Sequence, residues 1–331
     1  MLMRAFVTGA TGFVGHNLVI ELRAAGWDVI ALVRLDSDAR HLDALGVTTR
    51  EGTVTDAQTV LAAMPEGVDA VFHVAGSTSL WKRGDAQQTL VNVGGTANVV
   101  RAAIARRATR LVHTSSVGAY GHHHTRIDES TPSNAESSWI NYIRTKRAAE
   151  LEVLRGLTEG LDAVIVNPPH IVGPYDRRNW ARLIRLVRDG KLPGVPPGAG
   201  SWCHVREVAR AHIAALERGR TGEHYLLGGT DASFLEAVQL IGRLVGKPVP
   251  RKPLPTFVLK TVAMLNELAA AFTGREPDLT PEGAALVCET ILTDCGKAVR
   301  ELGYRAVPLE TMFSDCWEWM QSDEGSRVRP T

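Results

Sequence analysis

The stretch Thr8-Gly9-Ala10-Thr11-Gly12-Phe13-Val14-Gly15 directly follows a short apolar run, Met3-Arg4-Ala5-Phe6-Val7. A helical pattern from Asn17 to Ala25 comes next, and a second apolar run covers Asp28 to Arg34. This is the order of strand, glycine turn, helix and strand, within roughly the thirty residues that a βαβ unit needs. The stretch therefore predicts a doubly wound parallel α/β sheet whose first crossover begins at the glycines.

The three glycines have separate physical roles in such a turn. Gly9 permits the tight turn, Gly12 lets the backbone approach a pyrophosphate, and Gly15 lets the helix pack close to the strand. The N–H groups and the positive dipole at the helix N-terminus then favour an anion. A glycine turn without a ligand is the alternative, but its place after the first strand favours a dinucleotide site. The expected contacts in this turn are Gly9, Thr11, Gly12, Phe13, Val14 and Gly15.

The end of the second strand bears on which dinucleotide binds. Arg34 stands about twenty residues after the third glycine, where an acidic residue would bind the ribose 2′-hydroxyl of NAD. An arginine suits the 2′-phosphate of NADP through a charge-assisted pair, and Arg40 could supply a second cation. Asp36 follows closely and keeps NAD(H) possible. The sequence therefore favours NADP(H).

Two further apolar runs end in residues suited to a ligand. The run from Asp69 to Gly76 ends in small residues, which leave room at the edge where open α/β sheets bind ligands. The run from Arg110 to Thr114 is followed by Ser115 and Ser116, whose hydroxyls would face the same crevice. The expected cofactor contacts at this edge are Val74, Ala75, Gly76 and Thr114.

Tyr142 and Lys146 are four residues apart on a helical stretch, so they share a helix face. Hydride delivery to a carbonyl builds an alkoxide that needs a proton, and a phenol with a pKa near roughly 10 is a poor donor at neutral pH. We expect Lys146 to lower the pKa of Tyr142 and Ser116 to polarise the carbonyl oxygen. Lys146 can also hold the nicotinamide ribose. Ser116, Tyr142 and Lys146 are thus the predicted catalytic residues.

Together, Thr-Gly-x-x-Gly-x-x-Gly, the serine before Tyr120-Gly121, and Tyr-x-x-x-Lys make the chain resemble the extended branch of the short-chain dehydrogenase/reductase superfamily. The resemblance implies that Ser116, five residues before Gly121, is the catalytic serine. It also implies that Thr53 and Val54 lie near the adenine, with Thr53 in the place of the family's aspartate. Asn92 stands in a stretch that resembles the family's Asn-x-x-Gly-Thr motif, and we expect it to have a structural role. His73 is expected to be a packed strand histidine.

The stretch Asn167-Pro168-Pro169-His170-Ile171-Val172-Gly173-Pro174 resembles the family's loop that backs the nicotinamide. This implies cofactor contacts from Asn167, Pro168 and His170. Sugar-nucleotide epimerases and dehydratases usually have an asparagine where this chain has His170, and an arginine for the substrate diphosphate where it has Gly200. Asn167-Pro168 instead resembles the dihydroflavonol-reductase-like branch, which reduces ketones and aldehydes with NADPH.

The bulk composition excludes several classes of protein. A chain of 331 residues can form a full α/β core and one smaller domain, and its composition, 44% hydrophobic and 22% charged, is that of a soluble protein. A net charge of +1 gives no reason to expect nucleic acid or an acidic membrane as partner. The four cysteines form no metal-like pair, and we expect idle thiols in a reducing compartment. The first strand begins almost at Met1, so we expect no signal peptide and a cytoplasmic protein.

Two other stretches have a plain interpretation. Phe257 to Phe272 is largely apolar, but Lys260 and Glu267 interrupt it and it is too short to span a membrane. We expect a substrate-lid or core helix rather than a membrane-surface helix. Three consecutive histidines, His122 to His124, cannot share one face of a helix or strand, so we expect a loop and no metal site.

The predicted fold is a Rossmann-type doubly wound sheet with a smaller C-terminal α/β lobe. The dinucleotide-binding domain is assigned to 1–174, with 201–230 returning to it, and 175–331 is assigned mainly to a substrate-binding lobe. Within the first domain, helices 96–106 and 142–155 are where a homodimer would pair.

The predicted function is that of an NADP-dependent oxidoreductase, a carbonyl reductase of ketones or aldehydes, acting on a small and apolar substrate. The candidate residues of the pocket wall are Ser116, Trp81, Trp139, His170, Trp180 and Trp202. An NAD-dependent sugar-nucleotide epimerase or dehydratase, which uses the same tyrosine, is the alternative. A non-catalytic NADP sensor is disfavoured, because such proteins commonly lack the tyrosine or the lysine and this chain keeps both.

Overall fold

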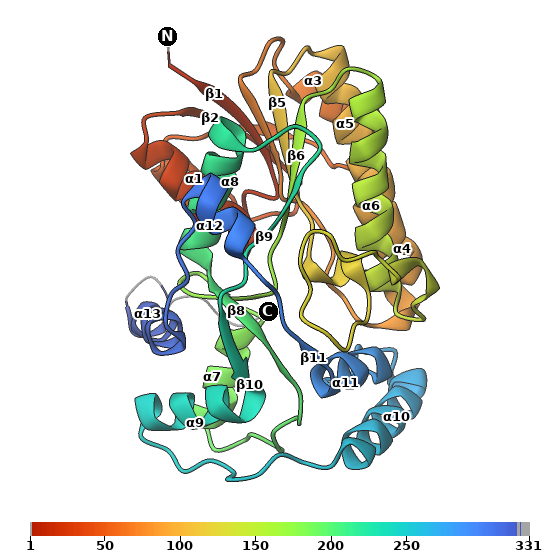
Figure 1. Ribbon diagram of the computed structural model, residues 1–331, viewed down its shortest axis with the longest axis vertical. Helices are drawn as coiled ribbons and strands as arrows, with labels where there is room; N and C mark the ends of the chain where they lie inside the picture. The colour runs from red at the N-terminus through yellow and green to blue at the C-terminus, as the bar shows by residue number, and fades with distance from the viewer. Residues whose placement is uncertain (1, 323–324, 326–331) are drawn as a thin grey trace.

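The computed structural model describes residues 2–322 and 325, and its larger sheet has seven parallel strands in the order β3-β2-β1-β4-β5-β6-β9 (Figure 1). These strands are β1 (Arg4–Thr8), β2 (Asp28–Val33), β3 (Thr48–Glu51), β4 (Ala70–His73), β5 (Arg110–Thr114), β6 (Ala163–Asn167) and β9 (His224–Leu226). The chain runs outward from β1 to β3 and then restarts at β4 on the other side of β1. This reversal defines a doubly wound Rossmann-type sheet, so the predicted fold class is confirmed.

Helices cover both faces of this sheet because side chains alternate along each strand. Ala5 and Val7 of β1 belong to one hydrophobic core and Phe6 to the other, all without exposed surface. The first core is closed by α1 (Phe13–Ala24), α8 (Val205–Arg218) and α12 (Gly296–Leu302), with α2 (Arg40–Ala44) beside them. The second is closed by α3 (Ala57–Ala63), α5 (Gly95–Ala105) and α6 (Asn141–Thr158). Between α3 and α5 lie β4, α4 (Asp85–Thr89) and a π-helical turn, Leu90–Gly94.

A second, smaller sheet lies beyond the carboxyl edge of the first (Figure 1). Its strands are β7 (His170–Val172), β8 (Ala199–His204), β10 (Thr230–Ser233) and β11 (Thr290–Ile291). β8 pairs in parallel with β7 and β11 and antiparallel with β10. Three helices pack on it around a core of their own: α7 (Trp180–Arg188), α9 (Phe234–Val245) and α13 (Leu309–Gln321).

A helical hairpin completes the smaller lobe. It consists of α10 (Thr256–Thr273) and α11 (Pro281–Cys288), which pack on each other. The helix expected over the apolar stretch is therefore present. None of the helices in the described part of the chain combines the length and the apolar character needed to span a bilayer.

The structure differs from the sequence-based expectations in two local details. Helix α1 begins at Phe13 rather than at Asn17, because Gly12 already takes the N-cap position directly after the turn. The stretch after Pro169 was expected to be a loop, but Ile171 and Val172 pair with β8 as part of strand β7. Two β-branched residues after a proline pair suit a strand that starts anew, and this strand leaves the larger sheet for the smaller one.

Candidate active site

The glycine turn between β1 and α1 has no room for side chains. Gly9 has a positive φ of 75°, and a Cβ on it would lie 2.6 Å from the backbone nitrogen of Ala75. A Cβ on Gly15 would lie 2.1 Å from the carbonyl oxygen of Gly9. The turn is thus pressed against the end of β4 on one side and against the first turn of α1 on the other. Both contacts require glycine.

The N-terminus of α1 is open to an anion. Its N-cap is Gly12, which has no side chain to accept hydrogen bonds from the helix, and no acidic residue stands in the first turn. The first-turn N–H groups of a helix have no partner within the helix, and its dipole favours negative charge there. The side chain of Asn17 ties α1 to the loop after β7 by donating to the carbonyl oxygen of Pro174 at 3.1 Å. These features fit the pyrophosphate of a dinucleotide.

The two arginines expected to read the adenosine ribose lie on the surface beyond β2. Arg34 Nε is 3.3 Å from Asp36 Oδ1, and both side chains are exposed. Arg40 donates two hydrogen bonds to the Asp38 carboxylate, at 2.9 and 2.7 Å, at the start of α2. Each cation is therefore near the predicted place, and each is paired with an aspartate that a 2′-phosphate would have to displace or share.

The predicted adenine contacts follow β3. Val54 is buried, and its carbonyl oxygen accepts a hydrogen bond from Asn98 at 2.8 Å. The hydroxyl groups of Thr53 and Thr55 form a hydrogen bond at 3.0 Å. On the other side of β1, the backbone N–H of Ala75 donates to Thr8 Oγ1 at 3.3 Å, between Val74 and Gly76. These residues lie along the carboxyl edge of β1, β3 and β4, and their contacts with the cofactor stay a prediction.

Ser116, Tyr142 and Lys146 meet at the carboxyl end of β5. The side chains of Ser116 and Tyr142 meet at Gly118, where a Cβ would lie 3.5 Å from Ser116 Oγ and 3.4 Å from Tyr142 Cε1, and the Ser116 hydroxyl acts on the Tyr142 pKa as a hydrogen-bond partner. Lys146 Nζ donates to the carbonyl oxygen of Thr114 at 3.0 Å and would lie 3.6 Å from a Cβ on Gly76. Two residues of one helix face thus reach the ends of the adjacent strands β4 and β5. Ser115 lies apart from this group, since its hydroxyl donates to Glu150 at 2.6 Å.

Burial determines the acid–base properties of the pair. It raises the pKa of the Tyr142 phenol, while the hydrogen bond with Ser116 acts in the opposite direction. Lys146 is not among the groups that shift this pKa here, so its expected effect on Tyr142 stays a prediction. Burial also lowers the pKa of Lys146 to about 8, against the opposing effect of the Glu150 carboxylate. Lys146 therefore remains mostly protonated at neutral pH.

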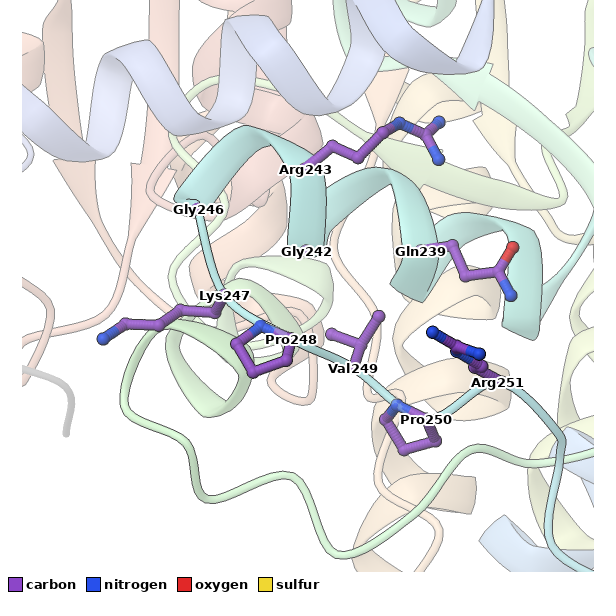
Figure 2. Close-up of a pocket in the computed structure, with 9 residues that line it drawn as sticks. All are labelled: Gln239, Gly242, Arg243, Gly246, Lys247, Pro248, Val249, Pro250 and Arg251. Atoms are coloured by element: carbon purple, nitrogen blue, oxygen red, sulfur yellow. The ribbon is translucent and has the colours of Figure 1, made fainter.

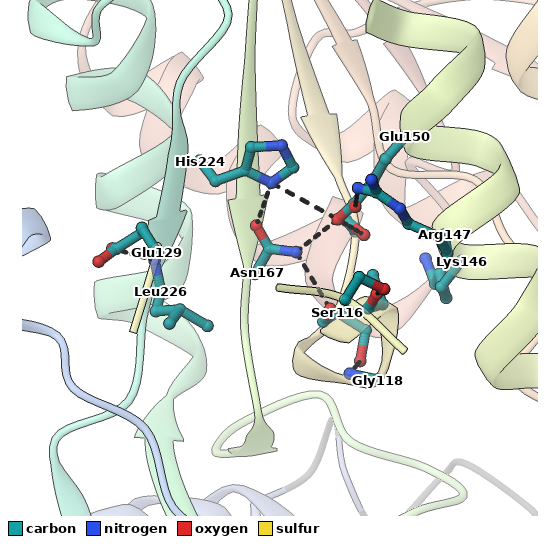
Figure 3. A network of polar contacts seen from close by, with 12 residues as sticks. Ser116, Gly118, Glu129, Lys146, Arg147, Glu150, Asn167, His224 and Leu226 are labelled. Carbon is teal, nitrogen blue, oxygen red and sulfur yellow. Dashed lines mark hydrogen bonds and ion pairs between the residues drawn. The ribbon is translucent and has the colours of Figure 1, made fainter. Parts of the chain in front are cut away.

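A buried carboxylate that the sequence analysis missed holds this region together (Figure 3). Glu150 accepts hydrogen bonds at 2.6 Å from both Ser115 and Asn167, and its other oxygen pairs with Arg147 at 3.2 Å. The Asn167 amide also donates to the carbonyl oxygen of Ser116 at 3.1 Å. His224 completes the group at 3.3 Å from the Asn167 oxygen. Glu150 follows Tyr142 and Lys146 at the same spacing of four, and that repeat could have indicated it.

The predicted nicotinamide contacts lie in two different places in the structure: Asn167 and Pro168 in one, and His170 in the other. Asn167 belongs to the Glu150 network, and the Pro168 carbonyl accepts from the Val117 backbone at 3.2 Å, beside Ser116. His170 instead lies in the aromatic core of the smaller lobe, with ring centroids 5.3 Å from Trp180 and 5.0 Å from Trp202.

The four predicted tryptophans also separate. Trp180 and Trp202 pack together at 4.5 Å, and Trp202 has no exposed surface. Trp81 lies under the Arg83 guanidinium at 5.5 Å. Trp139 is 57% exposed and stands two residues before the start of the helix that carries Tyr142. Among these, Trp139 has the most accessible position near the catalytic residues.

His73 and Asn92, which the sequence analysis expected to be structural, both have buried hydrogen-bond partners. His73 bonds Thr8 and Thr96 through its two ring nitrogens, at 2.8 and 2.9 Å, and is fully buried. Asn92 bridges Ser77 and Thr145 through its amide. In residues 2–322 and 325, no group of three His, Cys, Asp or Glu side chains is placed to hold a metal ion.

Comparison with known proteins agrees with this geometry. The profile of the NAD dependent epimerase/dehydratase family matches residues 5–228. A provisionally named dihydroflavonol 4-reductase from Synechocystis sp. is 33% identical over 326 residues, which cover 96% of this chain and 94% of that protein. A ketoreductase of a farnesylated dihydroquinoline-1-oxide from Stigmatella aurantiaca is 35% identical over 91% of this chain and 92% of its own.

The solved structures give the same fold. The crystal structure of gox2253 superposes with a TM-score of 0.83 at 33% identity, covering 96% of this chain and 97% of that one. A nucleoside-diphosphate-sugar epimerase from Pseudomonas aeruginosa superposes with a TM-score of 0.77 at 25% identity, covering 96% and 97%. The chain belongs to the NAD-dependent epimerase/dehydratase family of extended short-chain dehydrogenases/reductases, and it is an NAD(P)-dependent oxidoreductase.

Proposed function

We propose that this enzyme is an NADP-dependent carbonyl reductase. The observation that carries the proposal is the contact of Ser116 with Tyr142 at the carboxyl end of β5, the same strand end at which the buried Lys146 ammonium bonds the Thr114 carbonyl oxygen. This arrangement supports roles for Tyr142 as proton donor, for Ser116 as the hydroxyl that polarises the oxygen, and for Lys146 as the positive charge. The relatives named as reductases support the same reaction class.

The residues of this chain have separate tasks in that reaction. NADPH, when bound, supplies a hydride to the carbonyl carbon. Tyr142 donates a proton to the carbonyl oxygen, so that the product is an alcohol and no charge remains on oxygen. Ser116 donates a hydrogen bond to the same oxygen as it becomes negative. Lys146 lies close enough to Tyr142 on the helix to stabilise the phenolate that remains and to hold ribose hydroxyls.

The smaller lobe supports an apolar substrate rather than a sugar nucleotide. A Cβ on Gly200 would lie 2.5 Å from the ring of His170, so this position has no room for a side chain. The diphosphate-binding arginine expected of sugar-nucleotide enzymes therefore has no place there. Curated relatives are named for farnesylated, sterol and 2-alkyl-3-oxoalkanoate substrates, which are rich in hydrocarbon.

The cofactor preference rests on Arg34 and is tested by titration. Wild-type protein and Arg34→Ala are titrated with NADPH and with NADH, following nicotinamide fluorescence. We expect tighter binding of NADPH in the wild type, and a loss of that preference in the variant because the 2′-phosphate loses its charged partner. Each lost charge-assisted hydrogen bond is worth about 1.5–3 kcal/mol, or roughly tenfold to a hundredfold in affinity.

The opposite result would favour the second candidate function, a sugar-nucleotide epimerase or dehydratase. The contact between Arg34 and Asp36 supports that alternative, since Asp36 could bind the ribose hydroxyls of NAD. Structures of this fold with NAD bound are known, such as WbmH from Bordetella bronchiseptica, which superposes with a TM-score of 0.75 at 22% identity, covering 97% of this chain and 99% of that one. Preference for NADH, or NAD that co-purifies and does not exchange, would remove the NADP proposal.

Tyr142→Phe separates catalysis from cofactor binding. Loss of the proton donor is expected to lower kcat by about a hundredfold to ten-thousandfold, the usual contribution of general acid catalysis. Cofactor affinity should stay near that of the wild type, because the ring is kept and Lys146 is unchanged. Steady-state rates and the same fluorescence titration measure the two quantities. A variant that keeps wild-type kcat would remove Tyr142 from the reaction.

A homodimer through α5 and α6 is proposed as well. These helices pack on each other along one face of the larger sheet (Figure 1). Sedimentation equilibrium measures the oligomeric state directly, and a monomer at micromolar concentration would contradict this proposal.

A further inference from the structure

Two hollows stand out on the surface of the smaller lobe, and they differ in chemistry. One, of about 390 Å³, lies between α9 and the segment after it, and the exposed cations Arg243, Lys247 and Arg251 surround it (Figure 2). The other, of about 530 Å³, lies between the α10–α11 hairpin and the segment before α6. Only the second adjoins the helix that carries Tyr142 and Lys146.

The second hollow, the hairpin groove, has an apolar wall. Trp139 and Met264 face it with exposed side chains, and Pro281 and Ala285 of α11 line it as well. Charged side chains of both signs, Lys260 and Glu289, also line the groove. Its volume falls within the roughly 300–1,000 Å³ of small-molecule sites.

The groove adjoins the start of the helix that carries Tyr142 and Lys146. Ala285 lines the groove and also packs, together with Tyr142, against the buried side chains of Ile140 and Ile143. The segment Ser138-Trp139 lines the groove and leads directly into α6. Trp139, on the wall of the groove, therefore lies three residues before Tyr142 in the chain.

We propose that the hairpin groove binds the hydrocarbon chain of the substrate, so that the preferred substrates are carbonyl compounds with a long linear alkyl chain. The proposal rests on the carbonyl reductase function and adds to it the substrate class. A linear chain fits because the groove offers apolar contacts along one wall. The opposite charges of Lys260 and Glu289 give no net attraction for a charged substituent.

The test is a series of n-alkanals from butanal to dodecanal with NADPH. As long as added methylenes enter the groove, kcat/KM should rise by about fourfold per methylene, which corresponds to about 0.8 kcal/mol per buried CH2 group. Met264→Gln should flatten this rise. Leu268→Gln is the matched control: Leu268 lies one turn further on α10, is 61% exposed where Met264 is 63% exposed, and does not line the groove.

A second measurement does not depend on catalysis. Calorimetric titration with the corresponding n-alkanols, from butanol to dodecanol, should give affinities that rise with chain length in the wild type and in Leu268→Gln, but not in Met264→Gln. If alkanals are not reduced but alkanol affinity still rises with chain length, the reductase function is contradicted and chain binding in the groove is supported. Alkanol affinities that do not change with chain length would overturn the proposal that the groove binds the chain. Equal losses of affinity in Met264→Gln and Leu268→Gln would overturn it as well. The latter result would assign the effect to the exposed face of α10 and its contact with lipid or a second copy.

Discussion

At the scale of single residues, Glu150 connects catalysis to the architecture. Its carboxylate is 1% exposed and joins α6 to the ends of β5 and β6 through Ser115 and Asn167. Asn167 in turn holds the backbone of Ser116. Buried polar networks of this kind fix geometry when every member is satisfied. Through Asn167, Glu150 thus holds the backbone of Ser116, the predicted catalytic serine.

Glu150→Gln should change the pH profile as well as the rate. Glutamine keeps the size but removes the charge that raises the pKa of Lys146, so this pKa should fall below its value of about 8. The protonated lysine is the working form, and the alkaline loss of kcat/KM should therefore move to lower pH. Stability should fall by about 1–3 kcal/mol, because the amide NH2 group cannot accept the hydrogen bond that Arg147 now donates to the second carboxylate oxygen. The profile of kcat/KM against pH measures the shift.

Glu152→Gln is the matched control for this prediction. Glu152 lies two residues further on the same helix and pairs with Arg155 at the surface, away from the network. Its substitution should leave the pH profile unchanged, as surface pairs contribute little. An identical alkaline limb in Glu150→Gln and wild type would show that the carboxylate acts on folding alone.

The catalytic residues could be predicted from sequence because their chemistry and spacing are local. Tyr142 and Lys146 share a helix turn, and Ser116 ends a strand that the apolar pattern already reveals. The partners of Glu150 could not be found in this way. Asn167 and His224 are far apart in the sequence and meet only because β6 and β9 are neighbours in the sheet.

At the scale of elements, α10 has two opposite apolar faces. Leu259, Ala263 and Ala270 are buried against the rest of the lobe. Exposed apolar side chains lie on the other face: Phe257, Met264, Leu265, Leu268 and Phe272. The sequence predicted an apolar helix here but could not tell which face is covered. With apolar residues on two opposite faces, the periodicity that normally indicates the buried side is lost.

The two faces should respond differently to the same substitution. Ala263→Gln forces a larger polar side chain into a fully buried site and should lower the free energy of unfolding by about 1–3 kcal/mol. Leu268→Gln on the exposed face should change it by less than about 0.5 kcal/mol. Urea denaturation of both variants measures the difference. Equal destabilisation would mean that the outer face is covered in solution.

At the scale of the whole molecule, buried neutral histidines make the fold sensitive to acid. Burial lowers the pKa of His16 and His73 to about 3, and that of His170 and His212 to about 4, from an ordinary value of 6.5. His113 is shifted in the same direction, and neither of its ring nitrogens has a hydrogen-bond partner among the described residues. Protonation of any of them opposes the packed state.

Acid should therefore destabilise the protein well above the pKa values of its carboxylates. A histidine with a lowered folded pKa contributes its full stability above pH 6.5, and loses it as the pH falls from 6.5 toward the folded pKa. At about pH 5 the loss is about 2 kcal/mol for each such histidine. Urea midpoints at about pH 7 and about pH 5 measure this loss.

His113→Phe supplies the internal check. Phenylalanine nearly keeps the ring volume but removes the titrating group. The urea midpoint at about pH 7 should therefore stay unchanged, and the decrease of this midpoint toward about pH 5 should become smaller. Wild-type midpoints that coincide at the two pH values would exclude burial of neutral histidines as the cause.

The path of the chain between the two sheets limits how this protein can be divided. After β6 the chain enters the smaller sheet at β7 and β8, and it returns to the larger core with α8 and β9. It leaves again at β10, comes back with α12, and ends on the smaller lobe with α13. A single cut therefore separates neither lobe from the other. A chimera that exchanges substrate preference between relatives would need several coordinated junctions. New specificities in such a scaffold should arise more readily by point substitution along the α10–α11 hairpin than by transplanting a contiguous segment.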